Sequence, residues 1–288
     1  MVEILMSILT ASSFGLLFKY FEKKKLDSFQ AILVNYITAA VVGIITIGKI
    51  PFTAETIHQP WFPYAAGLGA VFFYSFYLIA VSISQAGISA TMVAAKMSLV
   101  IPTFAGIWLY SEGLGWMKIA GIMLALGSLV FTLSKPKGEG EEVKGQLLMP
   151  IIIFIVAGLQ DTVFGFTQRN YLNDANFEEF TIAVFLCAFV SGLLVTAVKV
   201  AQKQISFHGP SVLGGIALGI PNYFSVYFLV QALSLPGMGT SVIFPVMNIG
   251  IVAFSAIAAL LLFKEKLYTQ NWFGVLLALL AIGMISRG

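Results

Sequence analysis

Residues 88–110 read ISATMVAAKMSLVIPTFAGIWLY, and Lys96 is the one charged residue in this stretch. About 20 apolar residues are enough to cross a bilayer as a helix. A lysine near the centre of such a helix costs about 2.5–3.5 kcal/mol on insertion scales, and from mid-span its side chain is too far from either interface to snorkel. The stretch therefore predicts a membrane helix in which Lys96 faces the protein interior or water.

The composition of the whole chain is that of a membrane protein. Of its 288 residues, 59% are hydrophobic and 10% are charged, whereas soluble domains are about 45–50% apolar and about 25% charged. The net charge of +3 is too small and too scattered to indicate a nucleic-acid partner. The single cysteine, Cys187, and the two histidines, His58 and His208, form no metal-ligand pattern. We expect neither a metal nor a cofactor.

Hydropathy predicts an all-α, polytopic membrane protein of ten transmembrane helices. Windows of about 19 residues give the apolar spans 2–20, 29–48, 62–84, 88–110, 114–133, 147–167, 177–200, 212–235, 238–263 and 271–286. The longest polar interruption, SKPKGEGEEVKG, lies near the middle of the chain.

The two halves on either side of this interruption resemble each other. After the fourth and ninth spans, Glu112 corresponds to Glu265 and Gly121 to Gly274, each pair 153 residues apart. Five crossings reverse the side on which a half begins, so two five-helix halves of common origin have opposite orientations. Many secondary transporters are built from such inverted repeats, with the substrate site near the midplane between them.

We therefore predict two inverted five-helix repeats, at 1–133 and 147–288, joined by a linker at 134–146 and arranged around a central cavity. At a shift of 152 residues, Ser89, Lys96 and Thr103 correspond to Ser241, Asn248 and Ser255. Each triplet is spaced by seven residues, which places it on one helix face. A packing stripe would explain the hydroxyl groups but not the lysine, so we predict that Lys96 and Asn248 contact substrate.

One carboxylate lies at mid-depth in a span, namely Asp161, which follows Gln160 in VAGLQDTVFGF. Two interpretations are open. Lys96 and Asp161 form a buried ion pair that holds two helices together, or one or both of them contact the substrate or a coupling proton. An ion pair that opens and closes during transport would satisfy both interpretations.

Further polar and aromatic residues inside the spans are predicted to line the cavity: Asn35, Tyr74, Tyr77, Asn222, Tyr223 and Tyr227. Tyrosine in membrane helices is often an interfacial anchor, so Tyr223 and Tyr227, one turn apart near mid-span, are the stronger candidates. Pro102, Pro221 and Pro245 lie inside spans and leave a carbonyl without its usual donor. They are predicted to kink the helices or to act as gating hinges.

Two sequence blocks resemble those of the drug/metabolite transporter superfamily, in its ten-helix EamA-type branch. The blocks are LYSEGLGWMKIAGIMLALGSLVF (109–131) and LFKEKLYTQNWFGVLLALLAIGMI (262–285). The resemblance covers essentially the whole chain. It implies a basket of ten helices around a cavity lined by spans 1, 3, 4, 6, 8 and 9, with the 3–4 and 8–9 hairpins as gates. It also implies that Glu112 and Glu265 serve loop structure rather than substrate contact.

The expected function is secondary transport by alternating access across the cytoplasmic (inner) membrane. Members of the superfamily carry amino acids, nucleotide sugars, sugar phosphates, purines, vitamins and drugs. Lys96 is the one basic residue in the fourth and ninth spans. We therefore expect an amino acid or a similar carboxylate-bearing solute rather than a phosphate ester. Protons are a candidate coupling ion, lipid is the surrounding partner, and the protein is expected to be a monomer or a homodimer.

Two alternatives and the orientation are open. The alternatives are a nucleotide-sugar, purine or drug carrier, and a membrane sensor or structural protein that transports nothing. An enzyme is not expected, because the chain has no H-E-x-x-H, G-x-S-x-G or phosphate-loop motif. The resemblance implies cytoplasmic termini, but that orientation would leave four lysines and arginines inside and eleven outside, which the positive-inside rule disfavours.

Overall fold

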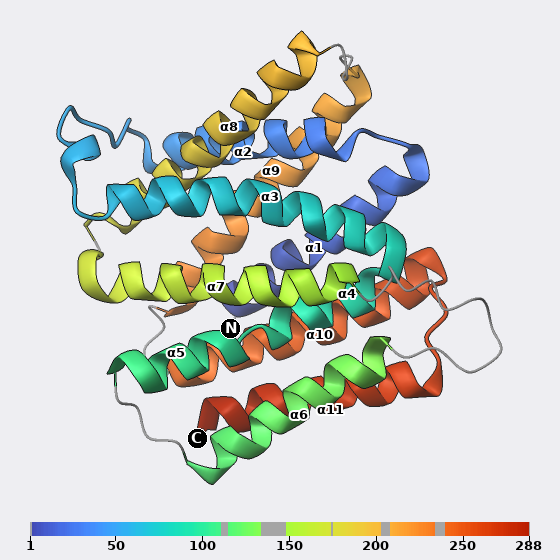
Figure 1. Cartoon of the computed structure of the whole chain (residues 1–288). Helices are drawn as coiled ribbons and strands as arrows, with labels where there is room; N and C mark the ends of the chain where they lie inside the picture. The colour runs from blue at the N-terminus through green and yellow to red at the C-terminus, as the bar shows by residue number, and fades with distance from the viewer. Residues whose placement is uncertain are drawn as a thin grey trace. The chain divides into compact units, whose positions relative to one another are not determined.

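The structure is a computed structural model that describes residues 2–110, 115–133, 148–173, 175–202, 208–233 and 240–287 (Figure 1). These residues form helices and no strands, which confirms the predicted all-α class. The α-helices are α1 (Val2–Lys24), α2 (Ser28–Ile47), α3 (Phe62–Ala86), α4 (Ile88–Met97), α5 (Val100–Tyr110), α6 (Trp116–Leu133), α7 (Leu148–Tyr171), α8 (Phe177–Ala201), α9 (Gly209–Leu233), α10 (Thr240–Phe263) and α11 (Thr269–Arg287). A 3₁₀ helix, η1, covers Thr56–His58. The predicted linker lies outside the described residues.

The helices have the length and composition of membrane spans. Within the described residues, eight segments are long and apolar enough to cross a bilayer. The apolar stretches of α6 and α11, Trp116–Thr132 and Thr269–Ile285, are shorter. The chain is therefore a multi-pass helical membrane protein. Helices lie at all ten predicted spans, and the crossing of the membrane by α6 and α11 stays a prediction.

The fourth predicted span is not one helix, because it is interrupted between α4 and α5 at Ser98 and Leu99. Pro102 explains the interruption, since it has no N–H to give to the carbonyl group four residues earlier. That carbonyl, on Ser98, accepts instead from the N–H of Ile101 at 2.9 Å. The ladder of hydrogen bonds thus shifts by one residue, and the helix restarts at Val100.

Two compact units divide the described chain. Unit 1 comprises Met1–Lys19, Leu78–Gly158 and Phe224–Gly288, and unit 2 comprises Tyr20–Tyr77 and Leu159–Tyr223. Each unit takes segments from both predicted repeats, so neither repeat is a separate compact domain.

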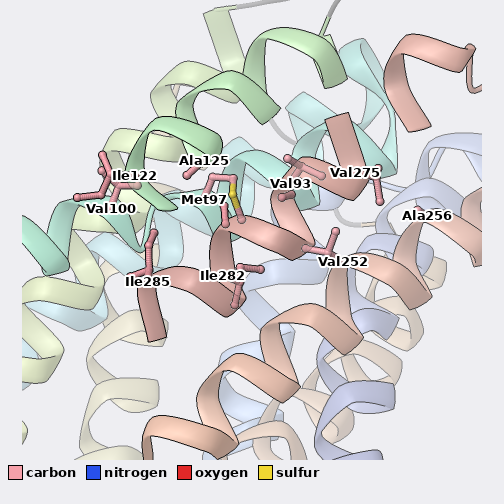
Figure 2. Packing of buried hydrophobic residues seen from close by; sticks show 12 residues of the cluster. Val93, Met97, Val100, Ile122, Ala125, Val252, Ala256, Val275, Ile282 and Ile285 are labelled. Atoms are coloured by element: carbon pink, nitrogen blue, oxygen red, sulfur yellow. The ribbon is translucent and has the colours of Figure 1, made fainter. Parts of the chain in front are cut away.

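The core of unit 1 is formed by α4, α6, α10 and α11. In Figure 1, α6 lies beside α11 and α4 lies beside α10, in agreement with their packing contacts. Figure 2 shows the apolar side chains that meet there: Val93, Met97, Val100, Ile122, Ala125, Val252, Ala256, Val275, Ile282 and Ile285. Burial of this surface holds α4, the helix that carries Lys96, against three neighbours.

Two glycines bring the backbones of α6 and α11 together in a reciprocal way. A Cβ atom added at Gly121 would lie 2.9 Å from the nitrogen of Ile285, and one added at Gly274 would lie 2.5 Å from the nitrogen of Thr132. Both pairs are related by the same shift of 153 residues that relates Glu112 to Glu265 in the sequence. Equivalent positions of the two predicted repeats therefore make equivalent contacts here.

Unit 2 contains a second exchange of this kind. On α3, a Cβ atom added at Gly69 would lie 2.6 Å from Cβ of Cys187 on α8. On α9, a Cβ atom added at Gly219 would lie 2.6 Å from Cβ of Thr38 on α2. The glycines are 150 residues apart and their partners 149 apart. In addition, α2 packs against α8, its counterpart in the predicted repeat.

Candidate functional site

Lys96 lies on the accessible side of an otherwise enclosed helix. Eight of the ten residues of α4 are buried, and the two that are half-buried are Ala95 and Lys96. A helix that is buried almost all round lies inside the protein rather than against lipid. Within α4, Ala95 and Lys96 are therefore the residues that keep partial exposure.

The interruption after α4 begins two residues beyond Lys96. The N–H of Leu99 makes a long bond of 3.4 Å to the carbonyl group of Lys96, and the hydroxyl group of Ser98 donates to the carbonyl group of Ala95 at 2.5 Å. The C-terminal end of α4 carries partial negative charge, which favours a nearby ammonium group. The N-terminal end of α5 carries partial positive charge, which favours an anion. The end of α4 is therefore a favourable place for the positive charge of Lys96.

Asn248 is half-buried on α10, the helix that packs against α4. The hydroxyl residues of the two predicted stripes, one with Lys96 and one with Asn248, differ in exposure. Ser89 and Ser255 are buried, and their hydroxyl groups have no hydrogen-bond partner among the described residues. Thr103 bonds to the carbonyl group of Leu99 at 2.7 Å. Thr103 is half-buried, as are Lys96 and Asn248. The Ser241 side chain lies outside the described part.

Asn35 and Asn222 form a buried pair in unit 2. They are 0% and 5% exposed, and Nδ2 of Asn222 donates to Oδ1 of Asn35 at 3.1 Å. The backbone of Asn35 also lies against Gly219, where α2 and α9 pack closely. The pair therefore sits in a helix contact rather than beside open space. Nδ2 of Asn35 has no hydrogen-bond partner among the described residues.

Gln160 and Asp161 are adjacent on α7. Gln160 is held by Ser75, a residue that the sequence analysis did not indicate. The hydroxyl group of Ser75, on α3, donates to Oε1 of Gln160 at 2.8 Å. Asp161 is exposed, as are Tyr74 and Tyr77 on α3. The one available signal for Ser75 was its position as a hydroxyl residue within the aromatic run VFFYSFY.

The two tyrosines favoured on α9 differ in their surroundings. Tyr223 is 6% exposed, and its ring lies 2.8 Å from the position of a Cβ atom at Gly43 on α2. Tyr227 is half-buried between Phe224 and Phe228, with ring centroids 6.0 and 5.4 Å away. Tyr223 is thus a packing residue within unit 2, and Tyr227 is the better placed to meet a solute.

The remaining predicted residues divide between the two units. Pro221 lies inside an unbroken α9, and Pro245 lies inside α10, where its side chain is not described. Lys96 belongs to unit 1 and Asp161 to unit 2, so the predicted meeting of these charges stays a prediction. Glu112 lies outside the described residues.

Comparison with known proteins places the chain by fold and not by activity. No protein-family model matches it. The chain is 27% identical over 287 residues to an uncharacterized protein of Haemophilus influenzae, covering 98% of this chain and 96% of that one. A solved crystal structure has the same fold, with a TM-score of 0.64 at 16% identity over 98% of this chain and 94% of the other. The chain is therefore similar to solved helical proteins along its whole length, and neither relative's name assigns a function.

Proposed function

We propose that the protein is a secondary carrier for a small carboxylate-bearing metabolite, such as an amino acid, and that Lys96 binds the carboxylate. The observation that carries the proposal is the half-buried position of Lys96 on the otherwise buried α4, directly before the interruption. Discontinuous membrane helices form the substrate and ion sites of many transporters. A lysine at mid-span is unfavourable in free energy. Binding of an anionic solute would explain why the chain has one there.

The reciprocal contacts support a carrier built from inverted repeats. Gly121 and Gly274 exchange equivalent partners in unit 1, and Gly69 and Gly219 do so in unit 2. Alternating access uses this symmetry, because the same contacts made by opposite halves give an inward-open and an outward-open state of similar energy. We propose ten crossings on this basis, with α6 and α11 as the fifth and tenth, in the cytoplasmic membrane.

The test is counterflow in proteoliposomes against pools of amino acids, other carboxylates, nucleotide sugars, purines and cationic drugs. Wild type is expected to exchange a carboxylate-bearing solute. Lys96→Gln should lower exchange at least tenfold, and Lys96→Arg should retain part of it. Lys49→Gln, an exposed lysine in a loop, is the matched control and should behave as wild type. Equal exchange by Lys96→Gln would contradict the role of Lys96, and no exchange of any pool would favour a sensor or structural protein.

Asp161 is proposed to take part in proton coupling. An exposed carboxylate in the middle of a membrane helix needs water or a partner, since charges are unfavourable in lipid. An imposed pH gradient should drive uptake by wild type and not by Asp161→Asn, whereas counterflow by the variant should persist. Uptake that ignores the gradient in wild type would leave Asp161 with a structural role.

A further inference from the structure

The turn between α3 and α4 consists of a single residue, Gly87. Its backbone has φ 88° and ψ 170°, a conformation that favours glycine, and its carbonyl group accepts from the Thr91 hydroxyl group at 2.8 Å. Thr91 in turn shares a buried hydrogen bond of 2.7 Å with Ser82 on α3. These bonds hold the hairpin together, but Gly87 has no side chain with which to cap the first N–H groups of α4.

Glu265, from the loop between α10 and α11, occupies that position. A Cβ atom at Gly87 would overlap with Oε1 of Glu265, so the carboxyl group rests directly on the turn. The chain reaches this point through Lys264, which adopts φ 53°, and through a bond of 3.2 Å from the N–H of Glu265 to the carbonyl group of Ala259. This geometry is a common helix-ending motif, and it turns the chain at the end of α10 so that Glu265 reaches Gly87.

The surroundings of the second carboxyl oxygen, Oε2, indicate that Glu265 does more than cap the start of α4. Oε2 of Glu265 is buried and makes no hydrogen bond within the described part of the chain, and the same is true of the Ser89 hydroxyl group in the first turn of α4. A bare carboxylate oxygen is costly to bury. A protonated oxygen is less so, because it is neutral and can donate to a hydroxyl group such as that of Ser89.

We propose that Glu265 is a protonatable latch that fastens the α3–α4 turn to the α10–α11 loop at one end of unit 1. Fastening this turn fixes the start of α4, the helix that carries Lys96. The latch does not depend on the identity of the transported solute. It would make one end of a carrier sensitive to the protonation of a group outside the membrane spans.

The surroundings of Glu265 determine the direction of its pH response. Burial raises the pKa of the carboxyl group above its ordinary value of 4.5, while the N–H groups of Ser89 and Ile88 and the charge of Lys19 on α1 lower it, with burial the larger effect. In the sequence, α3 carries no charged residue and α4 carries only Lys96, while Lys264 and Lys266 flank Glu265 and are exposed.

Protonation of Glu265 and fastening of the α3–α4 turn therefore favour each other. A carboxyl group released into water returns to its ordinary pKa, so the fastened state binds the proton more tightly than the released state. Acidic solution should keep the turn fastened, and the fastening should weaken as the pH rises through the raised pKa.

The test is a distance measurement between spin labels at Gln85→Cys and Lys266→Cys, two exposed positions beside the latch. Cys187→Ala removes the chain's single cysteine. In liposomes, the distance distribution should be narrow and short in acidic buffer and should gain a longer component as the pH rises. Glu265→Gln, which mimics the protonated group, should keep the short distance at every pH. Gly87→Ala should give the longer distance at every pH, because the added methyl group displaces the carboxyl group.

Glu55→Gln, an exposed carboxylate in a loop of unit 2, is the matched control and should respond to pH as the parent does. A distance in the parent protein that ignores pH would overturn the latch, as would a pH response that persists in Glu265→Gln. If Gly87→Ala fails to fold, Glu265→Gln alone decides. Because the readout is a distance, it is independent of whether the counterflow screen finds a transported solute.

Discussion

Asn35 and Asn222 show at the scale of single residues how a polar group is kept inside an apolar helix. Both amides are buried and share one hydrogen bond of 3.1 Å. The sequence indicates both residues, because an amide in a membrane span stands out, and their place beside a cavity stays a prediction. Their burial could not be predicted, since it depends on how closely α9 approaches α2 at Gly219.

We expect Asn222→Leu to lower the stability of the protein by about 1–3 kcal/mol, because Asn35 would keep a buried amide without its partner. The double variant Asn35→Leu, Asn222→Leu should lose less than the sum of the two single variants. Thermal unfolding of the purified protein in detergent gives the three differences. Strictly additive losses of stability would show that the two amides are not coupled. Both amides would then be candidates for contact with a solute.

The close approach of α6 to α11 makes Gly121 and Gly274 sensitive to any added atom. We expect Gly121→Ala and Gly274→Ala each to cost about 1–3 kcal/mol, because the methyl group would meet backbone atoms that cannot move aside. Gly127 and Gly283 are matched controls on the same two helices, since a Cβ atom there meets nothing within 4 Å. Their alanine variants should be neutral or stabilised through helix propensity. Equal effects in all four variants would contradict the reciprocal contact.

At the scale of helices, a helix lies at each of the ten apolar runs of the sequence, and one of these runs, the fourth, is interrupted. Pro102 is predicted to disturb the fourth span. The interruption falls at Ser98 and Leu99, because the carbonyl group of Ser98 lacks the N–H that a residue other than proline would supply at position 102. Proline acts on the turn before it, which explains why the sequence indicated the cause more clearly than the location.

The end of α1 offers a test of helix termination that is independent of function. Lys25 follows the helix with φ 54°, and the N–H of Leu26 bonds to the carbonyl group of Phe21 at 2.9 Å, a common helix-ending motif that prefers glycine. Lys25→Gly should therefore stabilise the protein by about 1 kcal/mol, whereas Lys24→Gly, inside the helix, should destabilise it by about the same amount. Thermal unfolding distinguishes them, and a loss of stability in Lys25→Gly would contradict the assignment.

At the scale of the whole molecule, the sequence predicted two repeats, while the compact units combine segments of both. Repeats are visible in a sequence because equivalent residues keep their order. Packing partners such as Glu265 and Gly87 are far apart in the chain, and nothing in their local sequence links them. In the predicted repeat, the counterparts of these residues are Glu112 and Gly239, which lie outside the described residues.

We propose that Lys96 supplies the charge of a solute site built from two equivalent helices, with Asn248 as its counterpart on α10. The most direct test is counterflow by the exchanged variant Lys96→Asn, Asn248→Lys beside Lys96→Asn alone, at matched protein incorporation. Because the lysine would then project from the equivalent position, the exchanged variant should recover a substantial part of the transport that the single variant loses. Transport by the exchanged variant no better than that of Lys96→Asn would contradict a shared two-fold site and leave Lys96 with a role confined to α4.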